Sequence, residues 1–357
     1  MAHEFELGLD TFGDVTYDAD GRLLPQWQVL RNVVAEAVLA DQVGLDFFGI
    51  GEHHREDFAV SAPEVVLAAI AGQTSRIRLG SAVTVLSSDD PVRVFQRFAT
   101  LDAVSNGRAE VILGRGSFTE SFPLFGYELD QYELLFEEKL NLFTELLTEK
   151  PVTWSGETRA ALSAQRVFPP TESGALRTWI GVGGSPQSVV RAARFGLPLM
   201  LAVIAGKPER FAPYVELYKR ALQQHGQPEL PVGLHSLGFV ADTDDEALEI
   251  QWPYYKEQFD WAARERGWPP PTYEQFMAEV DHGSMYVGSP ETVANRIAAT
   301  MKTLSLSRFD LLYAVGRIPH DQRIATIELY GREVIPRVRE LLAAIPEAEN
   351  APAAVRS

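Results

Sequence analysis

Short apolar runs alternate with longer amphipathic stretches along most of the chain. The apolar runs are nearly continuous in hydrophobicity, which is typical of parallel strands covered on both faces. They predict strands at residues 5–10, 47–51, 78–86, 109–114, 178–183, 197–203, 232–241 and 309–315. The amphipathic stretches predict helices at residues 26–43, 63–74, 91–105, 131–148, 186–195, 208–225, 244–266, 290–304 and 320–342.

Strands that alternate with helices in this way form either a TIM barrel or a doubly wound sheet. No G-x-G-x-x-G turn follows the first predicted strand, which disfavours a dinucleotide-binding doubly wound sheet. We therefore predict an α/β fold, a (β/α)8 TIM barrel, as a single domain over residues 1–342. Its insertions follow strands 4 and 7, because residues 115–130, 151–177 and 252–287 exceed a minimal barrel.

The chain ends differ from this pattern. Residues 343–357 are small and polar, and we predict a disordered tail there. The N-terminus lacks a basic segment followed by an apolar one, so no signal peptide is expected. No apolar run is long enough for a membrane span. A cytoplasmic location follows as the expectation.

Charge and cysteine content exclude several classes of function. The chain carries 49 acidic and 32 basic residues, a formal charge of -17. Nucleic acids and anionic membranes bind basic surfaces, so neither is expected as a partner. Cysteine is absent, which excludes disulfides, thiolate nucleophiles and cysteine metal ligands.

The second predicted strand runs into Glu52, His53 and His54. In a TIM barrel the active site lies at the carboxyl ends of the strands. One histidine there is a candidate acid–base group, because its charge changes near neutral pH. Two alternatives stay open at this point: a two-histidine metal site, although no third ligand is evident nearby, and ordinary local hydrogen bonding.

Two later strands are followed by loops suited to an anion. Arg115 stands between two glycines after strand 4, where a guanidinium reaches an anionic ligand without obstruction. A Gly-Gly turn after strand 5 opens a helix at Ser185, whose free N–H groups, with the hydroxyls of Ser185 and Ser188, suit a phosphate. In strand 3, Ser81 and Ala82 are small enough for a flat ligand to approach. Plain turns, helix capping and tight packing explain each feature equally well alone.

Taken together, these segments resemble the bacterial-luciferase-like flavin-dependent monooxygenases. The resemblance spans roughly residues 4–340 and is closer to non-bioluminescent relatives than to the luciferases themselves. Luciferases have an acidic residue at the position of Gly184 and a cysteine at that of Gly114. The segments that carry it are GEHHRED (51–57), LGSAVTVLSSDDPVRVFQRFATLDAVSNGRAEVILGRGSFTESFPLFGY (79–127), GGSPQSVVRAARFGLPLML (183–201) and VGSPETVANRI (287–297).

This resemblance implies a homodimeric TIM barrel that receives reduced FMN from a separate NAD(P)H:flavin reductase. Oxygen adds at flavin C4a, and the resulting (hydro)peroxyflavin oxidises a small organic substrate. His53 matches the catalytic histidine and Glu52 its orienting partner. The flavin-flanking strand-3 position, often a non-proline cis peptide, falls on Ala82-Val83. The remaining flavin and phosphate contacts match Arg115, Gly116, Ser117, Gly184, Ser185 and Ser188.

The resemblance leaves the substrate and the cofactor's identity open. Phe118, His235 and Arg317 are candidate substrate contacts, with structural roles as the alternative. An F420-dependent hydride-transfer enzyme uses a related barrel, and a non-catalytic flavin-binding protein would share these segments. A metal-dependent hydrolase built on Glu52 and the two histidines is the alternative from another class.

Overall fold

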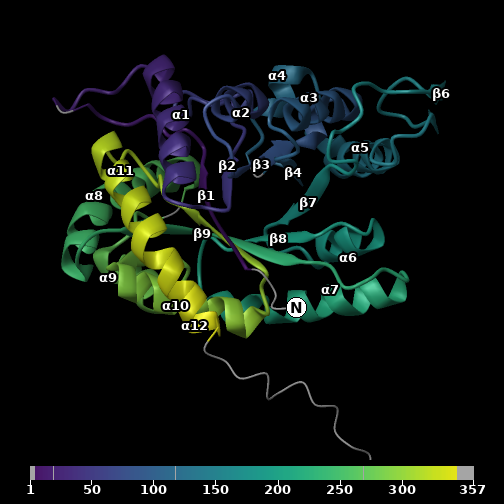
Figure 1. Cartoon of the computed structure of the whole chain (residues 1–357). Helices are drawn as coiled ribbons and strands as arrows, with labels where there is room; N and C mark the ends of the chain where they lie inside the picture. Colours follow the sequence, from purple (N-terminus) through teal and green to yellow (C-terminus); the bar gives the residue numbers. More distant parts are fainter. Residues whose placement is uncertain (1–4, 19, 117, 268, 344–357) are drawn as a thin grey trace, which may run out of the picture.

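The computed structural model describes residues 5–18, 20–116, 118–267 and 269–343 (Figure 1). Within these ranges, eight parallel strands close into a barrel in the order β1-β2-β3-β4-β7-β8-β9-β11, and β11 returns to β1. The TIM barrel prediction is confirmed. The barrel strands are β1 (Glu6–Thr11), β2 (Phe47–Ile50), β3 (Arg78–Val85), β4 (Ala109–Gly114), β7 (Arg177–Val182), β8 (Leu199–Ala202), β9 (Val232–Val240) and β11 (Arg308–Leu312).

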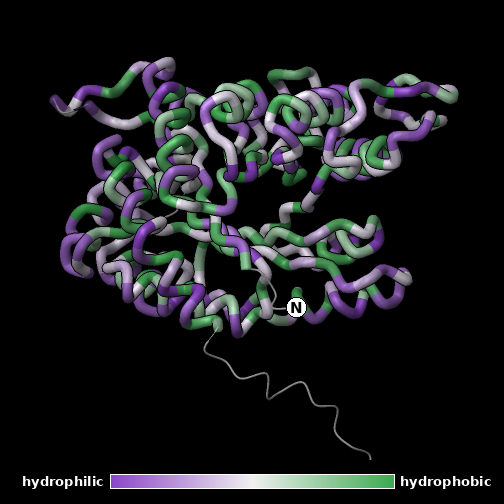
Figure 2. The backbone as a smooth tube through the Cα atoms, viewed as in Figure 1, coloured by the Kyte–Doolittle hydropathy of each residue, from purple (hydrophilic) through white to green (hydrophobic). Residues whose placement is uncertain are grey.

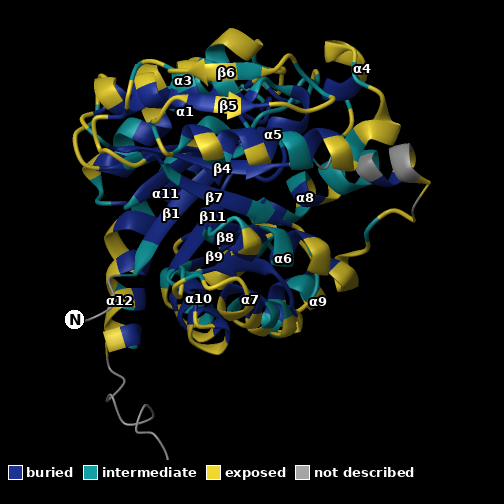
Figure 3. Ribbon diagram, turned by 90° about the vertical axis from the view of Figure 1, so that its right-hand side faces the viewer, coloured by how far each residue is buried: buried dark blue, intermediate teal, exposed yellow. Residues whose placement is uncertain are grey.

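Helices surround the barrel, and Figure 3 shows its strands as a buried centre inside partly exposed helices. Figure 2 shows hydrophobic and hydrophilic residues interspersed along these helices, as expected for amphipathic elements. The outer helices are α1 (Gln26–Gln42), α2 (Pro63–Ala71), α3 (Pro91–Val104), α5 (Tyr132–Leu146), α6 (Pro186–Arg194), α7 (Ala212–Gln224), α8 (Asp244–Arg266), α10 (Pro290–Leu304), α11 (His320–Leu329) and α12 (Ile335–Ala343). None of the helices in the described part of the chain is long and apolar enough to cross a membrane.

The insertions contain regular structure that the sequence pattern predicted only in part. The excursion over residues 151–177 is an antiparallel hairpin, as expected, built from β5 (Val152–Trp154) and β6 (Leu162–Gln165). The segment over residues 252–287 also holds α9 (Tyr273–His282) and β10 (Met285–Gly288), which pairs with the last residues of β9. Short helices fill the loop after β4, where α4 spans Ser121–Phe125.

One long helix predicted over residues 320–342 is interrupted. A π-helical turn, η4 (Tyr330–Val334), separates α11 from α12. Ala343 still belongs to α12, whereas residues 344–357 lie outside the described ranges, so the disordered tail stays a prediction.

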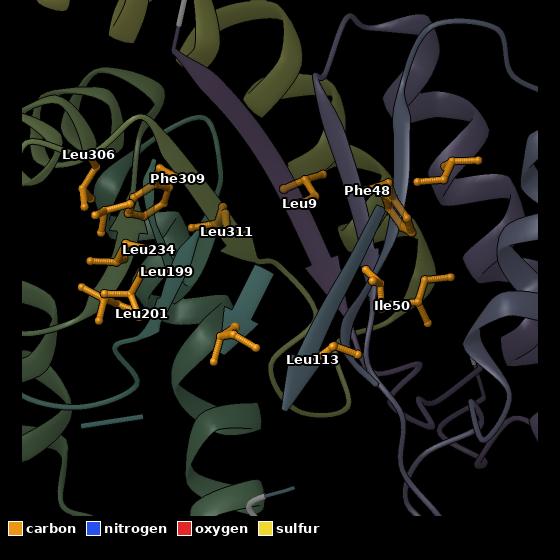
Figure 4. Packing of buried hydrophobic residues seen from close by; sticks show 14 of the residues in the cluster. Leu9, Phe48, Ile50, Leu113, Leu199, Leu201, Leu234, Leu306, Phe309 and Leu311 are labelled. Atoms are coloured by element: carbon orange, nitrogen blue, oxygen red, sulfur yellow. The ribbon is translucent and has the colours of Figure 1, made fainter. Parts of the chain in front are cut away.

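Leucine, isoleucine and phenylalanine side chains on the outer face of the strands pack against the helices. Figure 4 shows this layer around two sides of the barrel. At roughly 25 cal/mol per Å² of buried apolar surface, this layer supplies the main stabilising term. The residues labelled there are Leu9, Phe48, Ile50, Leu113, Leu199, Leu201, Leu234, Leu306, Phe309 and Leu311.

The inside of the barrel is filled near the amino ends of its strands. Arg308 is fully buried there, and its guanidinium lies 3.5 Å from the ring centre of Phe47. Its Nε donates to both carboxylate oxygens of Asp310 at 2.9 and 2.8 Å, and its Nη1 donates to Glu110. Trp179 closes this plug from β7.

Nearer the carboxyl ends of the strands, the inward positions are occupied by alanine or by glycine, which has no side chain. A methyl group added at Gly49 would lie 2.9 Å from Cβ of Ala82, and one at Gly51 would lie 2.2 Å from the ring of Phe12. A Cβ at Gly114 would lie 2.5 Å from Val83. Glycine is therefore needed at these positions, because the neighbouring strands and the Phe12 ring pack directly against the backbone there.

We expect Arg308→Met to lower the free energy of unfolding by about 3–5 kcal/mol, because it removes the cation that hydrogen-bonds the two fully buried carboxylates of Glu110 and Asp310. Denaturant unfolding of the variant and the wild type measures this difference. Arg337→Met is the matched control, since Arg337 makes exposed ion pairs with Glu291 and Glu340. Its expected cost is under about 1 kcal/mol. Equal losses in both variants would contradict a structural role for the plug.

Candidate active site

His53 lies at the carboxyl end of β2, where aromatic rings surround its imidazole. Phe58 stacks on it with ring centres 4.4 Å apart, while Phe12 and Phe118 meet it edge-on at 4.9 and 5.0 Å. The ring is held at Nδ1 by Glu120, at 3.1 Å. Its Nε2 has no hydrogen-bond partner within the described ranges, so it is available to a ligand.

Glu120 comes from the insertion after β4, next to α4. One of its carboxylate oxygens contacts both His53 Nδ1 and, at 3.5 Å, the backbone N–H of His54. Burial alone would raise the pKa of Glu120, but its hydrogen bond with His53 and those to backbone N–H groups outweigh burial and lower the pKa. Glu120 is therefore an anion that fixes the orientation of His53.

Glu52 contacts the other histidine. Its Oε1 lies 2.9 Å from His54 Nε2, and its Oε2 accepts a hydrogen bond from the backbone N–H of Val85 at 2.9 Å. The expected pairing of Glu52 with His53 is therefore wrong, because Glu52 and His54 point together toward β3 while His53 points away. A carboxylate 67 residues along the chain from His53 could not be assigned to it from sequence spacing.

The strand-3 position lies beside this motif. The Ala82-Val83 peptide is cis, and the carbonyl of Val83 accepts a hydrogen bond from the backbone N–H of Glu52 at 3.3 Å. Ala82 points into the barrel, where its neighbours are the glycines of β2. This inner wall offers backbone rather than bulky side chains to a flat ligand.

A second group of polar residues gathers around the start of α6. Ser185 caps the helix, and its hydroxyl accepts a 3.4 Å hydrogen bond from the backbone N–H of Ser188. Gly184, immediately before it, has a φ of +123°, which a residue with a side chain rarely adopts. The hydroxyl of Ser188 is buried without a hydrogen-bond partner within the described ranges.

Two arginines flank this helix start. Arg115, after β4, and Arg191, on α6, both bind the carboxylate of Glu133 on α5, Arg191 at 2.8 Å. A buried nitrogen of Arg191, Nη1, has no hydrogen-bond partner among the described residues. A helix N-terminus, an orphaned hydroxyl and two guanidiniums are the groups that a phosphate monoester requires. We call Arg115, Ser185, Ser188 and Arg191 the anion cradle.

Arg191 escaped the sequence analysis because it reads as an ordinary exposed position of an amphipathic helix. Gly116 lies near the cradle, since its carbonyl accepts a 2.8 Å hydrogen bond from the Tyr132 hydroxyl and Arg115 lies over the Tyr132 ring. Its contact with the flavin stays a prediction. Ser117 falls outside the described residues.

The three candidate substrate contacts have different surroundings. Phe118 touches His53 and Phe58 at the mouth of the barrel. His235 points into the barrel and pairs with Asp10. Arg317 lies on the loop after β11, 35% exposed, where Glu257 and Tyr17 bind it at 2.9 and 3.0 Å.

No group of three or more His, Asp or Glu side chains suited to a metal ion occurs among the residues that the structure describes. The histidine pair divides between two different carboxylates, so the donors of the proposed two-histidine metal site point apart.

The family model of the luciferase-like monooxygenases matches residues 10–308. The chain is 26% identical over 331 residues to the uncharacterized protein y4vJ of Sinorhizobium fredii, covering 88% of this chain and 93% of that one. It is 27% identical over 227 residues to an alkanal monooxygenase alpha chain of Photorhabdus luminescens, covering 63% of this chain and 62% of the relative.

Solved structures share the fold. The monooxygenase RslO1 of Streptomyces bottropensis superposes with a TM-score of 0.78 at 21% identity, covering 93% of this chain and 99% of that one. The oxygenating constituent of 3,6-diketocamphane monooxygenase from Pseudomonas putida, in complex with FMN, gives 0.74 at 20% identity, with 94% and 99% covered. The coenzyme F420-dependent tetrahydromethanopterin reductase of Methanopyrus kandleri gives 0.71 at 19% identity, with the same coverage.

Proposed function

The chain belongs to the luciferase-like monooxygenase family, and we propose that it is an FMN-dependent enzyme that oxidises a small organic substrate with O2. The observation that carries the choice of FMN is the anion cradle, where the buried Ser188 hydroxyl and Arg191 Nη1 have no hydrogen-bond partner in the described part of the chain. Arg115, Arg191, Ser185 and Ser188 would hold the FMN phosphate, and the small residues inside β2 and β3 would accept the flavin ring. Reduced FMN, when bound, supplies the electrons that activate O2.

His53 is the proposed catalytic acid–base residue, because no described residue binds its Nε2 and aromatic rings shield it from bulk water. Glu120 is the proposed positioning residue, since its carboxylate fixes the Nδ1 side of the ring. Glu52 is instead proposed to position His54 and the end of β3, both of which it contacts. Phe118 would exclude water from the His53 side of the site, which protects a reactive oxygen species from side reactions.

An F420-dependent hydride transfer is the alternative, favoured by the fold shared with the Methanopyrus kandleri reductase. The diffusible NAD(P)H:flavin reductase, the homodimer and the cytoplasmic location stay predictions. A flavin supplied by another protein must exchange at every turnover, which fits a cradle whose arginines bind Glu133 when no phosphate does.

Anaerobic titration of the purified chain with reduced FMN, oxidised FMN and F420 tests the proposal, followed by addition of air. We expect binding of reduced FMN and consumption of O2 on aeration. Binding of F420 alone, without O2 consumption, would transfer the chain to the hydride-transfer branch. Tight FMN binding with no oxygen chemistry would instead support a flavin-binding protein.

Arg115→Ala should weaken FMN binding by about 10- to 100-fold, because a charge-assisted hydrogen bond to phosphate is lost. Riboflavin, which lacks the phosphate, should bind equally to the variant and the wild type. Glu133→Gln should act in the opposite direction and tighten FMN binding, because it removes the competing carboxylate. Fluorescence titration measures all of these affinities. Equal losses for FMN and riboflavin in Arg115→Ala would place the phosphate elsewhere.

His53→Ala should leave FMN affinity within about threefold, since the anion cradle is untouched. Its reduced, FMN-loaded form should return to oxidised FMN and H2O2 at least about tenfold faster after mixing with O2, because the acid–base group is gone. Glu120→Gln should give a smaller acceleration and a changed pH profile, as expected of a residue acting through His53. Stopped-flow absorbance measures the rates. Wild-type kinetics in His53→Ala would remove the catalytic assignment.

A further inference from the structure

A second histidine–carboxylate pair lies inside the barrel, apart from the β2 motif. His235 on β9 and Asp10 on β1 both point inward, and His235 Nδ1 hydrogen-bonds to Asp10 Oδ2. Asp10 is 1% exposed and His235 is 8% exposed. The remaining oxygen of Asp10, Oδ1, is buried without a partner among the described residues. A buried carboxylate in this state is costly unless it stabilises a cation beside it.

The pair adjoins the plug on the inside of the barrel. Asp310 of the plug is the neighbour of His235 on β11, whereas the neighbours of Asp10 on β2 and of His235 on β8 are Gly49 and Ala202. The His235 side chain remains 11% exposed although it points inward, so its accessible part faces the barrel interior. Its Nε2 has no hydrogen-bond partner within the described residues.

His235 also adjoins the aromatic surroundings of His53. The ring of Phe12 lies 4.9 Å from the ring of His53 and 6.3 Å from that of His235. The two histidines therefore flank one phenylalanine, each with its Nδ1 bound by a carboxylate and its Nε2 without a partner among the residues that the structure describes. Both free nitrogens belong to the same barrel mouth.

Electrostatics favour the protonated form of this imidazole. Burial alone would lower the pKa of His235, but the hydrogen bond to Asp10 and the charges of Asp10 and Asp310 outweigh burial and raise the pKa. The other charged groups that face this region are Arg308 beside Asp310, Glu110 beyond Arg308, and the titratable His53 across Phe12. When it is protonated, His235 presents a cationic N–H donor on the inside of the barrel.

We propose that His235, held by Asp10, is a specificity-determining residue that donates a hydrogen bond to the flavin ring and favours its reduced form. This inference rests on the proposed function. Two-electron reduction adds negative charge to the polar edge of an isoalloxazine ring, whereas the oxidised ring is neutral. A cationic donor in a low-dielectric site therefore distinguishes the two forms. In this proposal His53 acts in the reaction with oxygen, and His235 favours binding of the reduced flavin that reacts.

The test is the ratio of the dissociation constants of oxidised and reduced FMN, measured anaerobically at pH 7. We expect the wild type to bind reduced FMN more tightly, and His235→Gln to lower that ratio about 10- to 100-fold, because glutamine keeps a polar contact but not the charge. Asp10→Asn should lower it in the same direction, and it serves as the test variant if His235→Gln does not fold. A general disturbance of the site would weaken the binding of oxidised and reduced FMN alike and would leave the ratio of their dissociation constants unchanged.

His320→Gln is the matched control. His320 also pairs with a carboxylate, Glu36, at 2.8 Å, but it lies between α1 and α11. The ratio of the two FMN dissociation constants in His320→Gln should equal that of the wild type. Unchanged ratios in His235→Gln and Asp10→Asn, with FMN still bound, would overturn this inference alone. Failure of the wild type to bind either form of FMN would overturn the proposed function as well.

Histidine NMR titration of the ligand-free protein gives a readout that is independent of flavin. The His235 signal, identified by its loss in His235→Gln, should titrate above the ordinary histidine value of about 6.5. It should move down in Asp10→Asn. Titration at or below the ordinary value in the wild type would show that His235 is not a cationic donor near neutral pH and would overturn the proposal.

Discussion

A guanidinium buried inside the barrel determines what the rest of the interior can do. Arg308 binds Glu110 and Asp310 from neighbouring positions and stacks on Phe47, so the lower barrel is occupied by paired charges and aromatic rings. Buried charges that lack such pairing are strongly destabilising. Because the plug fills the lower barrel, the strands above it can carry glycine and alanine on their inner faces.

The open mouth then depends on residues that arrive from the insertions. Glu120 belongs to the segment after β4, yet it fixes the ring of His53 on β2. Glu133 on α5 joins Arg115, at the end of β4, to Arg191 on α6. The barrel strands therefore supply positions, while the insertion after β4 and helix α5 supply orientation. A substitution at Glu120 or Glu133 can then change the chemistry of the site without changing the fold.

How much of this arrangement could be predicted from the sequence depends on how far apart along the chain the interacting residues lie. The eight barrel strands were predictable because covered parallel strands are apolar on both faces, and helix starts such as Ser185-Pro186 have local signatures. β10 was missed because four residues carry too little pattern beside the longer helices around it. Glu120 and Asp10 were missed as histidine partners because their pairing is set by tertiary packing, which no local spacing encodes. Arg191 was missed because one face of α6 turns toward the cradle only when α5 packs beside it.

The overall charge of -17 gives these local contacts their importance. An acidic protein repels an anionic ligand at long range, and at physiological ionic strength that field is screened beyond about 8 Å. Affinity for a phosphorylated cofactor must then come from groups in direct contact with it. Here both arginines of the cradle pair with Glu133, and Arg191 pairs with Glu137 as well. His235 pairs with Asp10, so the protein places its positive groups beside carboxylates. A ligand binds tightly to such a site only where the negative groups of the ligand replace or complement those carboxylates. The distribution of charge, rather than the net charge, is therefore the basis of recognition.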